Sequence, residues 1–155
     1  MNTKLDKILA EISAGELIDK ITILEIKKDK ILNESKVKEI DKELNSLNDT
    51  ANKFIRDKSK ILSFKEQLKE INLKLWDIED AKRMAEKNND FGKIFVELAR
   101  NVYKFNDERA KIKLAINTSL GSNIKEVKSD ALSISKLLED SLWLSVATPV
   151  KKFLP

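Results

Sequence analysis

The sequence contains no cysteine and no histidine, and these two absences exclude several kinds of site. Without cysteine there can be no disulfide framework, no thiolate nucleophile and no cysteine-based metal site. Without histidine the chain lacks the commonest general base and the commonest metal ligand. Any catalysis would therefore use Asp, Glu, Lys, Arg, Tyr or hydroxyl groups, and we expect no cofactor and no metal.

Glycine and proline are scarce as well, with three glycines and two prolines in 155 residues, while 36% of the residues are charged. This composition favours long helices over many short strands. The formal net charge is +4, but acidic and basic residues are interleaved along the chain, so nucleic-acid binding is not the favoured function.

Long apolar runs are also missing. The segment from Met1 to Ile12 has no apolar run long enough for a signal peptide. No stretch approaches the roughly 20 apolar residues that are needed to cross a bilayer. We therefore expect no membrane span and a cytoplasmic location.

Two capping boxes mark predicted helix starts. Ser13 and Glu16 open a helix that we expect to reach about Leu32, after a short extended segment. This helix is apolar around most of its girth, which predicts burial on most sides. Ser63 and Glu66 form the second box and open a helix that ends at about Lys87.

Between these helices, the stretch from Ser35 onward carries a single apolar seam with spacings of three and four residues. Such a seam is typical of a peripheral helix that packs on one neighbour in coiled-coil manner. We predict that this helix and the helix from Ser63 form a long antiparallel hairpin with arms of about 36 Å. The seam consists of Val37, Ile40, Leu44, Leu47, Ala51, Phe54 and Ile61.

A fourth helix is predicted from Phe91 to about Leu120, closed by Gly121. It is again apolar most of the way round, so we expect it and the first helix to be the central pair. A weaker helix is predicted over about 129–146. The predicted fold is an all-α helical bundle, with residues 1–129 as one helical domain and residues 130–155 as a C-terminal helical extension and tail.

Polar side chains embedded in these apolar helices are the candidate site residues. On the third helix a basic residue stands between acidic ones on one face, an arrangement that can hold an anion. The alternatives are a surface ion-pair ladder there, and an internal salt bridge with a buried asparagine on the fourth helix. The candidate ligand-binding residues are Lys20, Glu25, Glu79, Arg83, Arg100, Tyr103, Asn106, Asp107, Arg109 and Lys113.

Several blocks of the sequence carry a distinctive order of residues: Gly15–Lys27, Leu75–Asp80, Phe91–Gly92, Glu97–Tyr103 and Asn106–Ala110. Together they resemble a bacterial family known as domain of unknown function 6165. The resemblance covers about Ile8 to Ser129, and the stretch Asp130 to Pro155 departs from the family pattern. It implies a bacterial helical domain and supplies no activity.

From these observations we expect a small anionic ligand to bind in a polar cleft between the first, third and fourth helices. The alternative is a protein adaptor or scaffold, in which the apolar seam of the hairpin pairs with another chain or with a second copy of this one. Helices that align Arg, Lys and Glu side chains can also stabilise charge in a transition state, so catalysis is left open.

Overall fold

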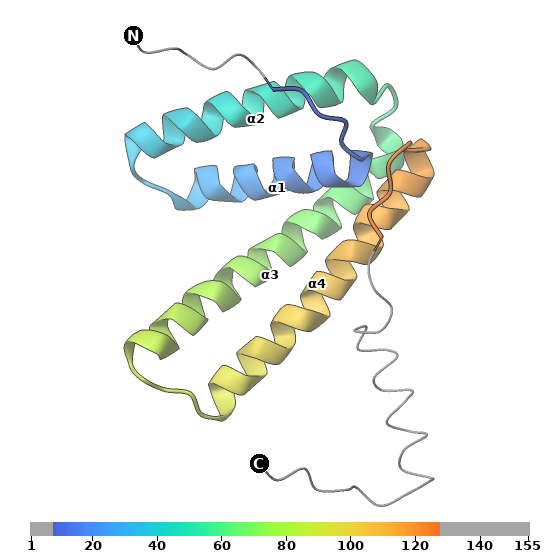
Figure 1. The fold of residues 1–155 in the computed structure, drawn as a ribbon. Coiled ribbons are helices and arrows are strands. Elements are labelled where there is room, and N and C mark those ends of the chain that lie inside the picture. The colour runs from blue at the N-terminus through green and yellow to red at the C-terminus, as the bar shows by residue number, and fades with distance from the viewer. Residues whose placement is uncertain (1–7, 128–155) are drawn as a thin grey trace, which may run out of the picture.

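The computed structural model describes residues 8–127, which form four α-helices and one short 3-10 helix (Figure 1). These are α1 (Ala14–Lys30), α2 (Glu34–Phe54), η1 (Ser59–Ile61), α3 (Leu62–Lys87) and α4 (Lys93–Leu120). No strand occurs within this range, so the all-α prediction is confirmed. The helix predicted over 129–146 lies outside the described residues.

Side-chain caps explain some of the helix ends. The Ser13 hydroxyl accepts a hydrogen bond from the Glu16 backbone N–H at 3.1 Å, as the first capping box predicts. Gly121 ends α4 in the left-handed conformation with φ of 64°, also as predicted. The second capping box is wrong: α3 starts at Leu62 as a continuation of η1, and no side chain caps it.

The fold consists of two antiparallel helical hairpins that cross near one end (Figure 1). One hairpin is α1 with α2 and the other is α3 with α4, while α1 also contacts both α3 and α4. Within the described range α2 does not contact α3, so the long hairpin exists but is made by α3 and α4. Helix α2 does not pair with α3 because its apolar seam is covered by α1, and a short turn joins α1 to α2. The chain then turns away through residues 55–61.

The hydrophobic core lies where the two hairpins cross. The side chains of Leu68 on α3 and Ile116 on the C-terminal half of α4 are fully buried there. Eight of the 17 residues of α1 are buried and only four are exposed, as the apolar circumference of this helix predicts. The core cluster consists of Leu17, Ile18, Ile21, Leu24, Ile40, Leu44, Ala51, Ile55, Ile61, Leu68 and Ile116.

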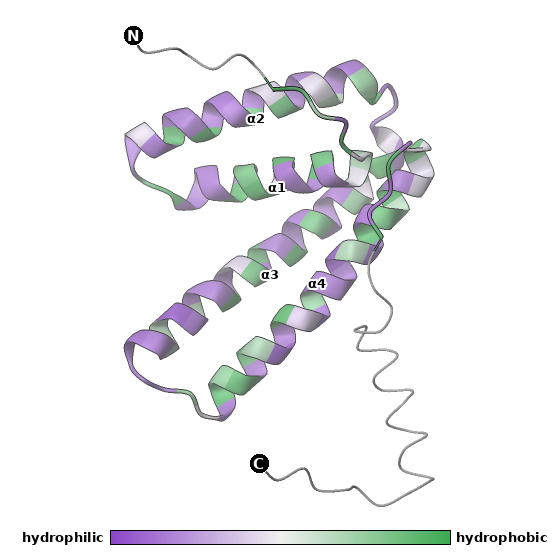
Figure 2. Ribbon diagram, in the orientation of Figure 1, coloured by the Kyte–Doolittle hydropathy of each residue, from purple (hydrophilic) through white to green (hydrophobic). Residues whose placement is uncertain are grey.

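Helix α4 is central only over its C-terminal half. Figure 2 shows hydrophobic residues along the N-terminal half of this helix. Large side chains there are exposed, including Ile94 at 69% and Tyr103 at 66%. The prediction that the first and fourth helices form the central pair therefore holds only for the C-terminal half of α4. The cause is the crossing of the hairpins, because the hydrogen bonds and ion pairs from α1 to α4 lie between Arg109 and Asn117, and the N-terminal half of α4 packs beside α3.

Candidate functional site

A buried polar network joins α1, α3 and α4 where they meet. The Asp19 carboxylate, which is fully buried, accepts hydrogen bonds from Nε of Arg109 at 2.9 Å and from its Nη2. Asn72 donates from Nδ2 to Asp19 Oδ1 at 2.8 Å and to Thr22 Oγ1 at 2.9 Å. The Thr22 hydroxyl donates to the backbone carbonyl of Asp19 at 2.8 Å. Within residues 8–127, no buried side-chain nitrogen or oxygen is left without a partner.

This network fixes the charge and the direction of Arg109. The hydrogen bonds to Asp19 raise the pKa of Arg109 above its usual range, against the lowering effect of burial. A carboxylate with no solvent exposure needs such a bidentate partner, because an unpaired buried charge is strongly destabilising. Arg109 is therefore held charged, with its side chain still 27% exposed.

A second ionic cluster lies one turn further along α4, around Lys113. Its ammonium group contacts Glu16 at 2.6 Å and also Glu126, and its side chain is only 9% exposed. Burial lowers the pKa of Lys113, but hydrogen bonds to Glu126 and Glu16 outweigh it and raise the pKa overall. This lysine joins α1, α4 and the segment after α4, which is a structural role.

Gly15 allows α1 to approach the backbone of α4 at this place. Its backbone N–H donates to Asn117 Oδ1 at 2.6 Å. A Cβ atom built on Gly15 would lie 2.4 Å from the carbonyl oxygen of Lys113, a backbone atom that cannot move aside easily. The small size of Gly15 therefore sets the crossing of α1 and α4.

A cleft of about 390 Å³ opens next to the Asp19–Arg109 network, between α1, α3 and α4. Three cations from three different helices line it, namely Lys27, Arg83 and Arg109. The remaining lining residues are Ile23, Ile26, Asn72, Leu75, Trp76, Glu79 and Asp80. The cleft therefore combines apolar walls, an indole ring and charges of both signs.

The ion pairs on the α3 wall are local to this helix, and the Arg83–Asp80 pair is exposed whereas the Glu79–Lys82 pair is half-buried. Arg83 contacts Asp80 at 3.3 Å, and Glu79 contacts Lys82 at 3.0 Å. An exposed pair contributes about 0 to 1 kcal/mol, so a ligand can replace the Arg83–Asp80 contact at little cost. This face is the ion-pair ladder of the sequence alternative, although with different partners, and it also borders the cleft.

Only some of the predicted ligand-binding residues lie close together in the structure. Glu79, Arg83 and Arg109 line the cleft, and Asn106 Oδ1 lies 3.5 Å from Nη1 of Arg109. Glu25 instead lies between Lys65 at 2.7 Å and Lys69 at 3.2 Å. Burial tends to raise the pKa of Glu25, but these two lysines lower it overall.

The other predicted residues lie elsewhere. Arg100 lines a separate groove of about 530 Å³ on α4, together with Lys93 and Lys104. Tyr103 and Lys20 are exposed, Asp107 is half-buried, and Lys113 belongs to the ionic cluster described above. The predicted convergence of α1, α3 and α4 therefore holds for Arg83 and Arg109 and not for Arg100.

The candidate residues chosen from the sequence did not include Asp19, Thr22 and Asn72, which form the buried network. A signal for Asn72 was present, because it follows Leu68 by four residues and precedes Leu75 by three, on the apolar stripe of α3. A polar residue at such a position needs a buried partner. The partner itself comes from α1 and could not be read from α3 alone.

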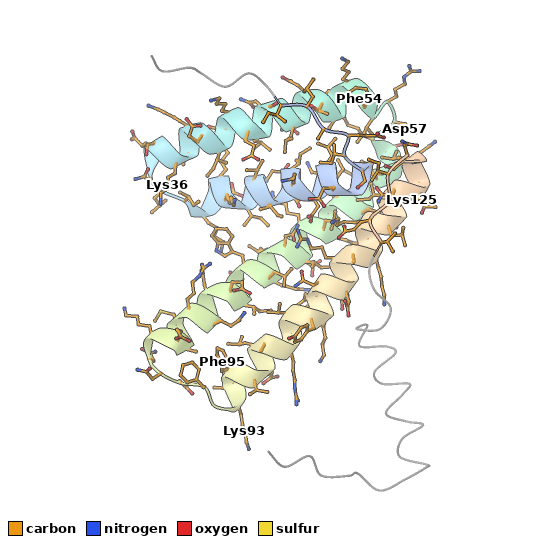
Figure 3. The ribbon with its side chains drawn as sticks, in the orientation of Figure 1. Lys36, Phe54, Asp57, Lys93, Phe95 and Lys125 are labelled. Carbon is orange, nitrogen blue, oxygen red and sulfur yellow. The ribbon has the colours of Figure 1, made fainter. Side chains whose placement is uncertain are left out.

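A larger hollow of about 630 Å³ lies at the end of the fold where the hairpins cross, near Phe54, Asp57 and the segment 10–12. Figure 3 shows Phe54, Asp57 and Lys125 at that end and Lys93 and Phe95 at the far end of the α3–α4 hairpin. The two cations that line this hollow, Arg56 and Lys60, are exposed and both lie in the connection between α2 and α3. Residues of α1, α2 and α4 line it, but its cations do not approach from several helices as those of the cleft do.

Two further findings describe the same part of the chain. No helix of residues 8–127 is both long and apolar enough to cross a membrane. These residues also contain no group of three or more His, Cys, Asp or Glu side chains that could hold a metal ion.

The described chain is thus an all-α domain of two crossed helical hairpins with a polar cleft beside their junction. It belongs to DUF6165, a family of unknown function, which matches residues 8–140. Searches of curated proteins and of solved structures returned no match. The family match confirms the resemblance found in the sequence. It also corrects its extent, because the match continues beyond Ser129 to residue 140.

Proposed function

We propose that the cleft between α1, α3 and α4 binds a small organic anion. The observation that carries this proposal is the approach of Lys27, Arg83 and Arg109, from three separate helices, to one concave surface. Cations that line a cleft with low-dielectric walls act together on an anion more strongly than scattered surface charges do. The carboxylates of Glu79 and Asp80 offset part of this charge, because Asp80 pairs with Arg83 itself, while Glu79 pairs with Lys82.

The walls of the cleft describe the rest of the ligand. Ile23, Ile26, Leu75 and Trp76 offer apolar surface, and a volume of about 390 Å³ falls in the range of small-molecule sites. An indole presents a flat face on which a ring or a planar group can stack. The anion that fits this cleft therefore carries an apolar or planar portion beside its acidic group.

Arg109 supplies the fixed cation of the proposed site. Asp19 occupies its Nε and one position on Nη2, so the guanidinium is held in place while other N–H donors remain available. The 27% exposure of this side chain supports access from the cleft. A cation held in this way loses little conformational freedom on binding, which favours affinity.

The adaptor alternative depended on an exposed apolar seam. That seam is covered by α1, because Ile40, Leu44 and Ala51 are buried members of the core, and only Phe54 is largely exposed. An adaptor would have to use a different surface. Anion binding in the cleft is therefore the better supported function.

The test is a thermal-shift screen of the wild type against inorganic phosphate, phosphorylated sugars, nucleotide sugars and dicarboxylates. A compound at a hundred times its dissociation constant adds about 2.7 kcal/mol of stability. For a chain of this size that corresponds to a rise in Tm of about 5 to 10 °C. We expect such a rise with at least one of these anions, and no rise with any of them would contradict the proposal.

Two exposed arginines provide a matched pair of variants for the same screen. Arg83 lines the cleft, whereas Arg100 lies on the separate groove of α4. Arg83→Gln should abolish the ligand-induced rise in Tm, and Arg100→Gln should keep it. A rise that survives Arg83→Gln and disappears in Arg100→Gln would place the ligand in the wrong groove.

A further inference from the structure

One end of the Asn72 side chain makes no hydrogen bond with residues 8–127. Asn72 is only 6% exposed, and its amide nitrogen uses both N–H groups, on Asp19 at 2.8 Å and on Thr22 at 2.9 Å. Its amide oxygen, Oδ1, accepts no hydrogen bond from these residues. Every buried side-chain nitrogen and oxygen among them has a partner. The Asn72 oxygen is therefore an atom that another molecule can reach.

The buried network determines which end of the Asn72 amide is free. The Asp19 carboxylate can only accept hydrogen bonds, so the atom that faces it must be the amide nitrogen. The Thr22 hydroxyl donates its one proton to the backbone carbonyl of Asp19 and can therefore only accept from Asn72. Both contacts hold the nitrogen against the network and leave the oxygen on the opposite side.

The free oxygen faces the cleft, because Asn72 lines it and its nitrogen is turned toward the network. Trp76, one turn further along α3, lines the same cleft. The Asn72 nitrogen and Nε of Arg109 both donate to one oxygen, Asp19 Oδ1, so these two nitrogens lie within about 6 Å of each other. The end of the cleft next to the network thus combines an acceptor, a fixed cation and an indole.

We propose that the ligand of this cleft is a hydroxylated anion whose hydroxyl group, next to its acid group, donates a hydrogen bond to Asn72 Oδ1. This inference rests on the proposed anion site and narrows its ligand to one chemical class, of which 2-hydroxy acids are the simplest members. The acid group lies against Arg109 and the apolar or planar portion against Trp76. An anion without the hydroxyl covers the amide oxygen and leaves it without a partner, which is unfavourable.

A hydroxyl group suits this position better than an ammonium group. Lys27, Arg83 and Arg109 line the same cleft and would repel a second positive charge inside it. A hydroxyl is neutral, and on the carbon next to the acid group it matches the short separation between the Asn72 amide and the Arg109 guanidinium.

Isothermal titration calorimetry on the full chain compares anions that differ only in the hydroxyl group. The three pairs are 3-phenyllactate with 3-phenylpropionate, malate with succinate, and glycerol 3-phosphate with propyl phosphate. In at least one pair the hydroxylated member should bind about three- to tenfold more tightly, the usual effect of one hydrogen bond.

The outcomes separate this inference from the proposed function. Equal affinities in every pair that binds, or no binding by any hydroxylated member, would overturn the inference. Anion binding itself stands in either case if some anion of the thermal-shift screen still raises the Tm. If none does, the proposed function fails and the inference fails with it.

Two variants distinguish recognition of the hydroxyl from support of the fold. Asn72→Ala removes the acceptor and should abolish the preference for the hydroxylated member of a pair. Thr22→Val perturbs the same network at a residue that does not line the cleft and should keep that preference. Equal weakening of both members in Asn72→Ala would show that Asn72 only supports the structure and would overturn the inference. If Asn72→Ala does not fold, the three pairs on the wild-type protein decide.

Discussion

Polar residues are buried where the helices meet, whereas apolar residues are exposed at the far end of the α3–α4 hairpin. At the junction Asp19, Asn72 and Lys113 are buried and fully partnered. At the far end Met84 and Phe91 are 55% and 51% exposed. This difference shows that the burial of a side chain depends on how many helices meet around it. A residue's own polarity decides only what partners it then requires.

This comparison has an energetic consequence. Chemically similar residues occur in both regions, so the same substitution can be made at each place. The substitution should lower the free energy of unfolding strongly at the junction and hardly at all at the far end, because the effect depends on local packing. The following experiments test that contrast in order of expected effect.

The largest effect is expected when the buried ion pair is broken. Arg109→Leu leaves the Asp19 carboxylate buried without its cation and should lower the free energy of unfolding by about 3 to 5 kcal/mol. Arg83→Leu removes an exposed pair with Asp80 and should change it by less than about 1 kcal/mol. Urea denaturation measures both, and equal losses in the two variants would contradict the comparison.

Truncation of an apolar side chain should show a similar contrast. Leu68 is fully buried, so Leu68→Ala should cost about 2 to 5 kcal/mol from lost burial and a cavity. Ile94 is 69% exposed, and Ile94→Ala should stay within about 0.5 kcal/mol of the wild type. Differential scanning calorimetry compares the two variants. A large loss in Ile94→Ala would mean that the far end is packed against something that residues 8–127 do not include.

Two glycines give the third contrast. Gly15→Ala brings a methyl group to 2.4 Å from a backbone oxygen, and overpacking of this kind costs about 1 to 3 kcal/mol. Gly92→Ala meets only the Asp90 side chain, at 3.3 Å, and should change the stability by less than about 1 kcal/mol. Thermal melts followed by circular dichroism distinguish them. An unaffected Gly15→Ala protein would show that α1 can shift along α4.

The smallest effect is a pH dependence at Glu25. Lys65 and Lys69 lower the pKa of Glu25 in the folded protein below its ordinary value of 4.5, so the unfolded state binds the proton first. The stabilisation is thus present above about pH 4.5 and is lost as the pH falls through the lower folded-state pKa. Relative to wild type, Glu25→Gln should be less stable at pH 6 and should lose less stability below pH 4.5. Urea midpoints at both pH values measure this, and parallel losses would contradict it.

The helices themselves could be predicted from local sequence, because their signals are local. The Ser13 cap, the Gly121 terminus and the periodicity of each stretch gave the helices nearly as observed. The pairing of the helices could not be predicted in the same way. The seam of α2 fits either of two neighbours equally well, and the choice of α1 depends on how residues 55–61 direct the chain.

The candidate site could also be predicted only in part from the sequence. Arg109 stood out because it interrupts an apolar helix, and Glu79 and Arg83 because acidic and basic side chains share one face of their helix. Arg100 stood out for the same reason as Arg109, yet it lies in a different groove, because burial along α4 ends where α1 leaves it. Asp19 lies on a helix with several other polar residues, and only the crossing of three helices distinguishes it from Lys20.

The most direct test of the account is a fluorescence titration of Trp76, which lines the cleft. The chain has two tryptophans, so Trp143→Phe leaves Trp76 as the only reporter. This protein is titrated with each anion of the thermal-shift screen. The account predicts a saturable change in emission with at least one anion, an unchanged midpoint in Arg100→Gln, and a midpoint at least about tenfold higher in Arg83→Gln, a loss of about 1.4 kcal/mol. No saturable change with any anion, or an unchanged midpoint in Arg83→Gln, would contradict it.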